Sequence, residues 1–193
     1  NCPSGIYVLP DKHDTHLWHC VTFIRKGPYT GGIFRFDIVF PVNFPAATPQ
    51  VYFPPTLLHP LVDPNTGRML LTSRFTNGWK PRETFVTHLL YFVKAAFQDD
   101  TIDGLREGLV ANLEVYKMYR DNKPLFKKLA HQSVSLSTSP SSLYDISGGS
   151  GFPSPSIGAD KGARNEEAAG IHFSKVDEDE MAALRREIFG DEE

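Results

Sequence analysis

Residues 53–81 read FPPTLLHPLVDPNTGRMLLTSRFTNGWKP, and the interpretation of the whole chain depends on this stretch. It contains a Pro-Pro bend, a His-Pro pair and a Pro-Asn-Thr-Gly turn before it reaches Trp79. A connection of this length inside a compact domain is usually functional, or is held in place by its own side chains. Its apolar residues predict that it packs onto the domain: Leu57, Leu58, Leu61, Val62, Met69, Leu70, Leu71, Phe75 and Trp79.

The residues before this stretch predict an antiparallel meander of four strands. The expected strands are residues 5–9, 17–25, 33–40 and 50–53, separated by turn residues such as the Gly-Pro-Tyr-Thr-Gly-Gly of residues 27–32. The third strand alternates most clearly, with Arg35 and Asp37 on one face. A strand with this period has one buried face, and the core side chains are then Phe34, Phe36, Ile38 and Phe40.

The residues after the stretch predict helices. Pro81 suits the first position of a helix, and residues 83–97 carry an apolar stripe wide enough for a helix buried against the sheet. Two shorter helices are expected over residues 112–122 and 124–131, interrupted near Pro124. We expect this folded domain to occupy residues 1–134.

The C-terminal part of the chain has a different composition. Residues 135–173 are rich in Ser, Gly and Pro, which predicts a flexible tail. Residues 174–193 predict an amphipathic helix whose acidic start, residues 177–180, suits the helix dipole. Such a helix is either a fraying tail or a partner-binding element. In the second case the binding residues would be Met181, Leu184, Ile188 and Phe189.

Composition limits the possible functions. The 193 residues are 40% hydrophobic, enough for one full core with residues to spare. A net charge of −3 argues against nucleic acid as the main partner. No signal peptide and no apolar run of membrane-spanning length is recognisable. Two cysteines, Cys2 and Cys20, are too few for a disulfide framework and favour a reducing cytosol.

Three histidines, His13, His16 and His19, raise the question of a metal site. On an extended chain His16 and His19 point to opposite faces, and the sequence indicates no carboxylate or thiolate cluster beside them. We therefore predict structural histidines, no metal and no cofactor.

The motifs of the central stretch resemble the active-site segment of the ubiquitin-conjugating enzymes. The resemblance rests on His59-Pro60, Gly67 and Trp79-x-Pro81, and on motifs in the same order upstream: Gly-Pro-Tyr, Gly-Gly-x-Phe-x-Phe, Asn-Phe-Pro and Pro-x-Val-x-Phe. It implies an α+β fold in which a four-stranded antiparallel meander packs on helices. The first helix of that family is absent here. Either the chain, which begins without Met, is truncated, or a helix-sized patch of sheet is uncovered.

The resemblance places the family's supporting Asn at Leu61 and its catalytic Cys at Leu70. Leucine has no thiolate to carry a thioester and no donor to stabilise an oxyanion. Cys2 lies at the extreme end of the chain and Cys20 falls in a strand, so neither replaces the missing thiol. The resemblance therefore implies the fold of these enzymes without their activity.

A narrower resemblance is to the fused-toes (AKT-interacting protein, crossbronx) family of inactive conjugating-enzyme variants. It rests on residues 59–67 and on four further segments: 5–8, 23–27, 143–147 and 173–175. It implies a scaffold that joins Hook coiled-coil proteins and an FHIP partner, links vesicles to dynein and binds the kinase AKT. The expected location is the cytoplasm, peripheral on vesicles or the plasma membrane through partners. The alternative is a variant that binds ubiquitin weakly and positions it for an active enzyme.

Overall fold

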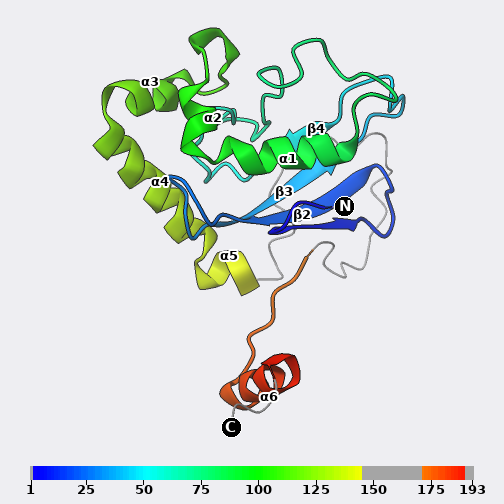
Figure 1. Ribbon diagram of the computed structural model, residues 1–193, viewed down its shortest axis with the longest axis vertical. Coiled ribbons are helices and arrows are strands. Elements are labelled where there is room, and N and C mark those ends of the chain that lie inside the picture. Colours follow the sequence, from blue (N-terminus) through cyan, green and yellow to red (C-terminus); the bar gives the residue numbers. More distant parts are fainter. Residues whose placement is uncertain (1, 145–170, 190–193) are drawn as a thin grey trace.

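The computed structural model describes residues 2–144 and 171–189. Its sheet contains the strands β1 (Ile6–Pro10), β2 (Leu17–Phe23), β3 (Ile33–Val39) and β4 (Gln50–Tyr52). They pair antiparallel in the order β1-β2-β3-β4. The predicted four-stranded meander is confirmed (Figure 1).

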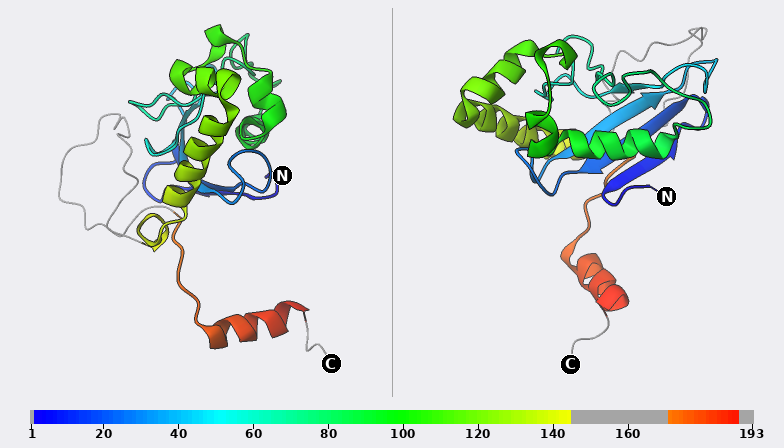
Figure 2. Two further views of the ribbon diagram at one scale, coloured as in Figure 1. Left: turned by 90° about the vertical axis from the view of Figure 1, so that its left-hand side faces the viewer. Right: turned by 45° about the horizontal axis from the view of Figure 1, so that its top comes forward.

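The strand register separates two faces of the sheet. Cys20 pairs with Val8 and Phe36, whereas Val21 pairs with Tyr7 and Arg35. Because paired residues share a face and successive residues alternate, Phe36 belongs to an inner face and Arg35 to an outer face. Helix α1 (Val86–Ala96) crosses the inner face (Figures 1 and 2).

Aromatic side chains fill the core between α1 and the sheet. The rings of Phe36 and Phe53 stack at a centroid distance of 5.1 Å, and those of Phe34 and Phe97 at 5.4 Å. Along α1 the buried residues recur on one wide stripe: Leu89, Leu90, Phe92, Val93 and Ala96. The predicted packing of this helix on the sheet is therefore confirmed.

The predicted start of that helix is wrong. Helix α1 begins at Val86, and Pro81 lies in a preceding turn in which the carbonyl of Lys80 accepts hydrogen bonds from the N–H groups of Glu83 and Thr84. Arg82 has a φ of 70°, a left-handed conformation that no α-helix continues through. A helix start at Pro81 is therefore impossible.

Further helices follow α1: α2 (Asp99–Asp103), the 3₁₀-helix η1 (Glu107–Leu109), α3 (Leu113–Asp121), α4 (Lys123–Ser137) and α5 (Pro140–Tyr144). Asn112 caps α3 by accepting from the N–H of Val115, and Asn122 caps α4 by accepting from that of Leu125. Helices α3 and α4 lie at one end of the sheet (Figure 2).

Helix α4 continues past residue 134, into the stretch whose composition predicts a flexible tail. Two of its serines make contacts with the domain: Ser133 Oγ accepts from the N–H of Leu58 at 3.1 Å, and Ser137 Oγ from that of Ile33 at 3.2 Å. Ser137 lies within the predicted tail, so the start of this stretch packs on the domain and is not a flexible linker.

The C-terminal helix α6 (Glu178–Phe189) stands away from the domain at the end of an extended segment (Figure 1). Of the proposed binding residues, Met181, Leu184 and Ile188 are exposed. Most of the predicted tail, residues 145–170, lies outside the described residues. None of the helices in the described ranges is long and apolar enough to cross a bilayer.

Candidate functional site

The central stretch is attached to the domain through His59. This side chain is fully buried; its Nδ1 accepts from the N–H of Leu61 at 3.0 Å, and its Nε2 donates to the carbonyl of Ala96 at 3.0 Å. Ala96 is the last residue of α1, where carbonyls lack helical partners. Through these two hydrogen bonds His59 provides a donor for the last carbonyl of α1 and fixes the turn after Pro60.

The electrostatic environment keeps His59 neutral. Burial lowers its pKa to about 4, although the hydrogen bond to Ala96 opposes this shift. The ring packs against Tyr29 and Phe97, at centroid distances of 5.4 and 5.2 Å. An imidazole enclosed in this way is a structural element and has no access to a substrate.

The backbone of residues 60–70 folds back on itself and on the sheet. The carbonyl of Pro60 accepts from the N–H groups of Ala111 and Asn112, each at 2.9 Å. Gly67 adopts a φ of +69° directly against the carbonyl of Phe53, where a Cβ would collide with that oxygen. Only glycine fits this position, because it combines a left-handed conformation with a close backbone approach.

Leu61 and Leu70 lie next to each other. The N–H of Leu70 donates to the carbonyl of Leu61 at 2.7 Å, and the neighbouring residues Val62 and Met69 form a β-bridge. Leu61 is fully buried, whereas Leu70 is half-buried. The two positions that resemble the family's Asn and Cys are therefore brought together in space, and both are aliphatic.

Trp79 closes the far side of the segment. Its ring is buried and lies 5.7 Å from both Phe44 and Phe75 between centroids. Its Nε1 has no hydrogen-bond partner within the described residues. Trp79 therefore acts as a packing residue for the segment, while Pro81 lies in the turn before α1.

A hollow of about 900 Å³ lies beside the segment, between residues 73–76 and α1. Its charged and polar lining includes Arg74, His88, Asp100 and Arg106. Its lining contains no cysteine. The hollow offers polar contacts to a bound group but no thiol.

The comparisons with known proteins agree with this geometry. The family model described as "Ubiquitin-conjugating enzyme" matches residues 1–134. The chain belongs to the ubiquitin-conjugating enzyme family. Within it, the chain is similar to proteins named crossbronx and AKT-interacting protein, as the narrower resemblance predicts.

The crossbronx homolog of Anopheles gambiae is 33% identical over 145 residues, 74% of this chain and 62% of its own length. The AKT-interacting protein of Danio rerio is 33% identical over 137 residues, 70% of this chain and 44% of its own. The AKTIP homolog of Nematostella vectensis is 33% identical over 132 residues, 67% of this chain and 42% of its own. The chain thus spans between 42% and 62% of the lengths of these three relatives.

Both cysteines of this conjugating-enzyme variant have thiols with raised pKa values. Cys20 is buried in β2, where burial raises the pKa of its thiol far above the ordinary value. Burial also raises the pKa of the Cys2 thiol, although Cys2 is exposed. A raised pKa reduces the thiolate fraction at neutral pH, and the thiolate is the reactive form.

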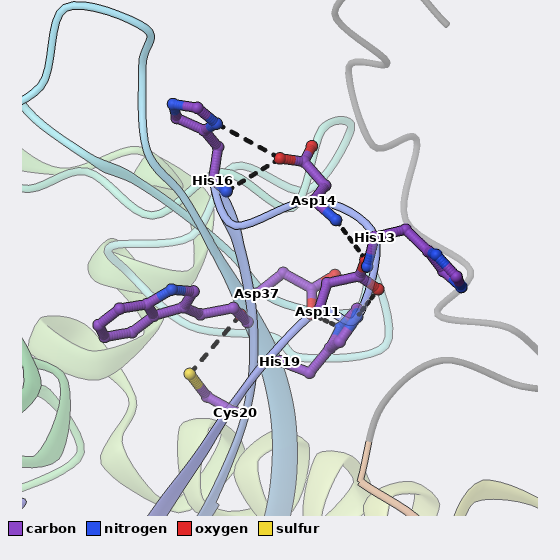
Figure 3. A network of polar contacts seen from close by, with 8 residues as sticks. Asp11, His13, Asp14, His16, His19, Cys20 and Asp37 are labelled. Atoms are coloured by element: carbon purple, nitrogen blue, oxygen red, sulfur yellow. Dashed lines mark hydrogen bonds and ion pairs between the residues drawn. The ribbon is translucent and has the colours of Figure 1, made fainter.

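One polar cluster was not predicted from the sequence, and it includes one of the three histidines, His19. His19 lies on the outer face of the sheet with its Nδ1 2.9 Å from Asp37 and its Nε2 3.2 Å from Asp11 (Figure 3). The sequence indicates no carboxylate cluster beside these histidines, yet the fold brings two separate carboxylates to His19. The pattern offered a weak signal, because Asp37 shares the polar face of β3 with Arg35.

This cluster is an ion-pair network. The hydrogen bond to Asp37 raises the pKa of His19, against the opposing effect of burial. Burial acts to raise the pKa of Asp11, but hydrogen bonds from the backbone N–H groups of His13 and Asp14 lower it, and the net result is a lowered pKa. His16 pairs separately with Asp14 at 3.4 Å (Figure 3). Among the described residues no group of three or more His, Cys, Asp or Glu side chains is placed to hold a metal ion.

Proposed function

We propose that this chain is a non-catalytic conjugating-enzyme variant that acts as a protein–protein adaptor. The observation that carries the proposal is the contact between Leu61 and Leu70, where the resemblance expects an amide and a thiol. A ubiquitin thioester needs a thiolate at the second position and a hydrogen-bond donor near it. Neither leucine supplies these groups.

The proposed partners are the kinase AKT and the Hook-type and FHIP-type proteins. Relatives from Danio rerio and Nematostella vectensis carry names that refer to AKT interaction, which supports the kinase. Hook and FHIP follow from the resemblance to the fused-toes family. In this proposal the chain acts in the cytoplasm and reaches vesicles or the plasma membrane through these partners.

Helix α6 supports an adaptor role. Its first turn is acidic, and its exposed apolar side chains Met181, Leu184 and Ile188 lie at helical spacing. An amphipathic helix of this kind typically lays its apolar face in a hydrophobic groove of a partner. The helix is thus the proposed contact to a helical or groove-bearing partner.

The first test is a thioester assay with activating enzyme, labelled ubiquitin and ATP. We expect no thiol-reducible adduct on this chain, because Leu70 has no nucleophile and the thiols of Cys2 and Cys20 have raised pKa values. An active conjugating enzyme in the same mixture is the positive control. A reducible adduct that disappears in Cys20→Ser would overturn the proposal.

Leu70→Cys is the matched variant for this assay. It supplies a thiol at the right place, but Leu61 still provides no amide, so we expect no efficient transfer of ubiquitin to lysine. If the unmodified chain instead binds ubiquitin and accelerates transfer by an active enzyme, the result would favour the ubiquitin-positioning alternative.

The second test removes the apolar face of α6. Leu184→Asp combined with Ile188→Asp should abolish capture of AKT, Hook-type or FHIP-type protein by the full chain, because the charges cannot enter an apolar groove. The melting temperature should stay unchanged, since both side chains are exposed. Ala183→Asp with Arg186→Ala makes the same change in net charge on the opposite side of the helix and should retain binding. Normal capture by the first variant would exclude α6 as the contact.

A further inference from the structure

The outer face of the sheet carries an apolar groove. Its floor includes Val21 and Phe23 of β2, and its rim includes Tyr7 and Leu9 of β1, which are 60% and 45% exposed. The groove has a volume of about 430 Å³ and is closed on its other side by Ile171, His172 and Phe173. Val21 is only 1% exposed although it faces away from α1. The outer face is therefore covered around Val21, with the C-terminal segment as part of its lining.

Arg35 holds this segment to the sheet. From the outer face of β3 its guanidinium donates to the carbonyl of Ile171 through Nε and Nη2, each at 3.3 Å. The same group donates to the carbonyl of Leu143 at 3.0 Å and to that of Ser142. One arginine thus joins the end of α5 to a segment nearly thirty residues later in the chain. A guanidinium suits this task because its planar donors reach several acceptors at once.

Aromatic and cationic contacts extend the attachment. The ring of Phe173 packs edge to face on Phe23 at 6.2 Å between centroids, and the guanidinium carbon of Arg35 lies 5.0 Å from the centre of the Phe173 ring. Two residues on, the ammonium of Lys175 lies 5.2 Å from the centre of the Tyr144 ring. Cation–π pairs at this separation are attractive. The segment therefore contacts β2, β3 and α5 through backbone and side chains alike.

We propose that the outer face of the sheet is a docking surface for an extended apolar-aromatic segment, that its occupant is the chain's own segment Ile171–Lys175, and that this attachment presents α6 to its partner from a fixed point. The last part rests on the proposed function of α6. The occupant is intramolecular because Arg35 binds Leu143 and Ile171 together, on either side of residues 145–170.

The attachment changes the reach of α6 greatly. Helix α6 begins at Glu178, three residues after Lys175, so the attached helix starts within about 10 Å of the docked segment. Released from the sheet, α6 would be joined to α5 only through the 33 residues that separate Tyr144 from Glu178 (178 − 144 − 1). A chain of that length has a typical end-to-end distance of roughly 30 Å. Docking therefore confines the helix to a small volume beside the sheet and raises its effective concentration there.

Paramagnetic relaxation measured by NMR on the full chain tests the docking. A nitroxide on Ser174→Cys, in a Cys2→Ser background, should strongly broaden the amide signals of residues 7–9 and 21–23. Arg35→Ala and Phe173→Ala should each remove most of this broadening, whereas Arg25→Ala, an exposed arginine just after β2, should leave it intact. Phe173 lies outside the sheet, so the broadening measured for Phe173→Ala can be interpreted even if Arg35→Ala lowers the melting temperature.

Two results would overturn the intramolecular docking. One is an absence of broadening in the parent chain, or its persistence in both Arg35→Ala and Phe173→Ala. The other comes from mixing an isotope-labelled chain that has no nitroxide with a chain at natural isotope abundance that carries one. Broadening in the isotope-labelled chain would make the occupant the tail of a second copy.

The presentation of α6 has its own readout. Arg35→Ala and Phe173→Ala should weaken partner capture several-fold and, unlike Leu184→Asp with Ile188→Asp, should not abolish it. Lost broadening with unchanged capture would overturn the presentation of α6 while leaving the docking intact. A failure of the α6 variants themselves would remove the proposed partner contact and would not affect the relaxation result.

Discussion

Replacing Phe36 by alanine should lower the free energy of unfolding by about 3–5 kcal/mol. The side chain is fully buried on the inner face of β3, and its ring stacks on Phe53 at 5.1 Å. Truncation removes the transfer energy of the ring and leaves a cavity that the paired strands on either side cannot close. Urea-induced unfolding at neutral pH, followed by circular dichroism, measures the difference.

Phe85→Ala is the matched control for this variant. It makes the same chemical change at a ring that is 55% exposed just before α1, so its cost should stay below about 1 kcal/mol. A loss of less than about 1 kcal/mol for Phe36→Ala would mean that this face of β3 is not the core. The sheet register would then be wrong, and with it the assignment of Arg35 to the outer face.

The elements that the sequence predicted well are those whose pattern is local. Alternation along residues 33–40 identified Phe36 as inward and Arg35 as outward, and the register confirms both sides. The family motifs located the central stretch within the part of the chain that the family model matches. The assignment of Leu61 and Leu70 to the positions of an Asn and a Cys stays a prediction. Their contact depends on a backbone hydrogen bond between residues nine positions apart, which only the folded chain reveals.

The features that the sequence did not predict depend on conformations or contacts without a periodic signal. The left-handed φ of Arg82 delays α1, although arginine carries no preference for that conformation. A serine of the predicted flexible tail, Ser137, becomes a hydrogen-bond acceptor for the domain. Likewise, the contact between Arg35 and Ile171 joins residues 136 positions apart. No local rule could have paired them.

His59 connects the family motif to a stability argument. The His-Pro pair resembles catalytic machinery, yet in this chain the imidazole joins Leu61 to the end of α1 while completely buried. The hydrogen bond from His59 to the carbonyl of Ala96 joins the segment before Leu61 to the end of α1. The motif therefore has a structural role that does not depend on catalysis.

The pH dependence of unfolding should reveal this role. The unfolded chain binds a proton at His59 with a pKa near 6.5, whereas burial lowers the folded value to about 4. Between these pH values His59 is protonated in the unfolded state and stays neutral in the folded state. The stability contributed by the neutral ring is therefore complete above pH 6.5 and is lost as the pH falls toward 4. The loss amounts to about 3 kcal/mol over this interval.

His59→Gln tests the assignment, because glutamine keeps a hydrogen-bonding amide but does not titrate. Urea melts between pH 4 and 7.5 measure the unfolding free energy of this variant. Below pH 6.5 this free energy should decrease much less than it does in the parent chain. His19→Gln is the control with the opposite sign. The raised pKa of His19 gives stability that is complete below pH 6.5 and is lost at higher pH. This variant should therefore lower the profile by a constant amount below pH 6.5 and change its slope only above that value. If the acidic fall persists in His59→Gln, another group takes up the proton, and the buried neutral imidazole does not stabilise the segment as its geometry indicates.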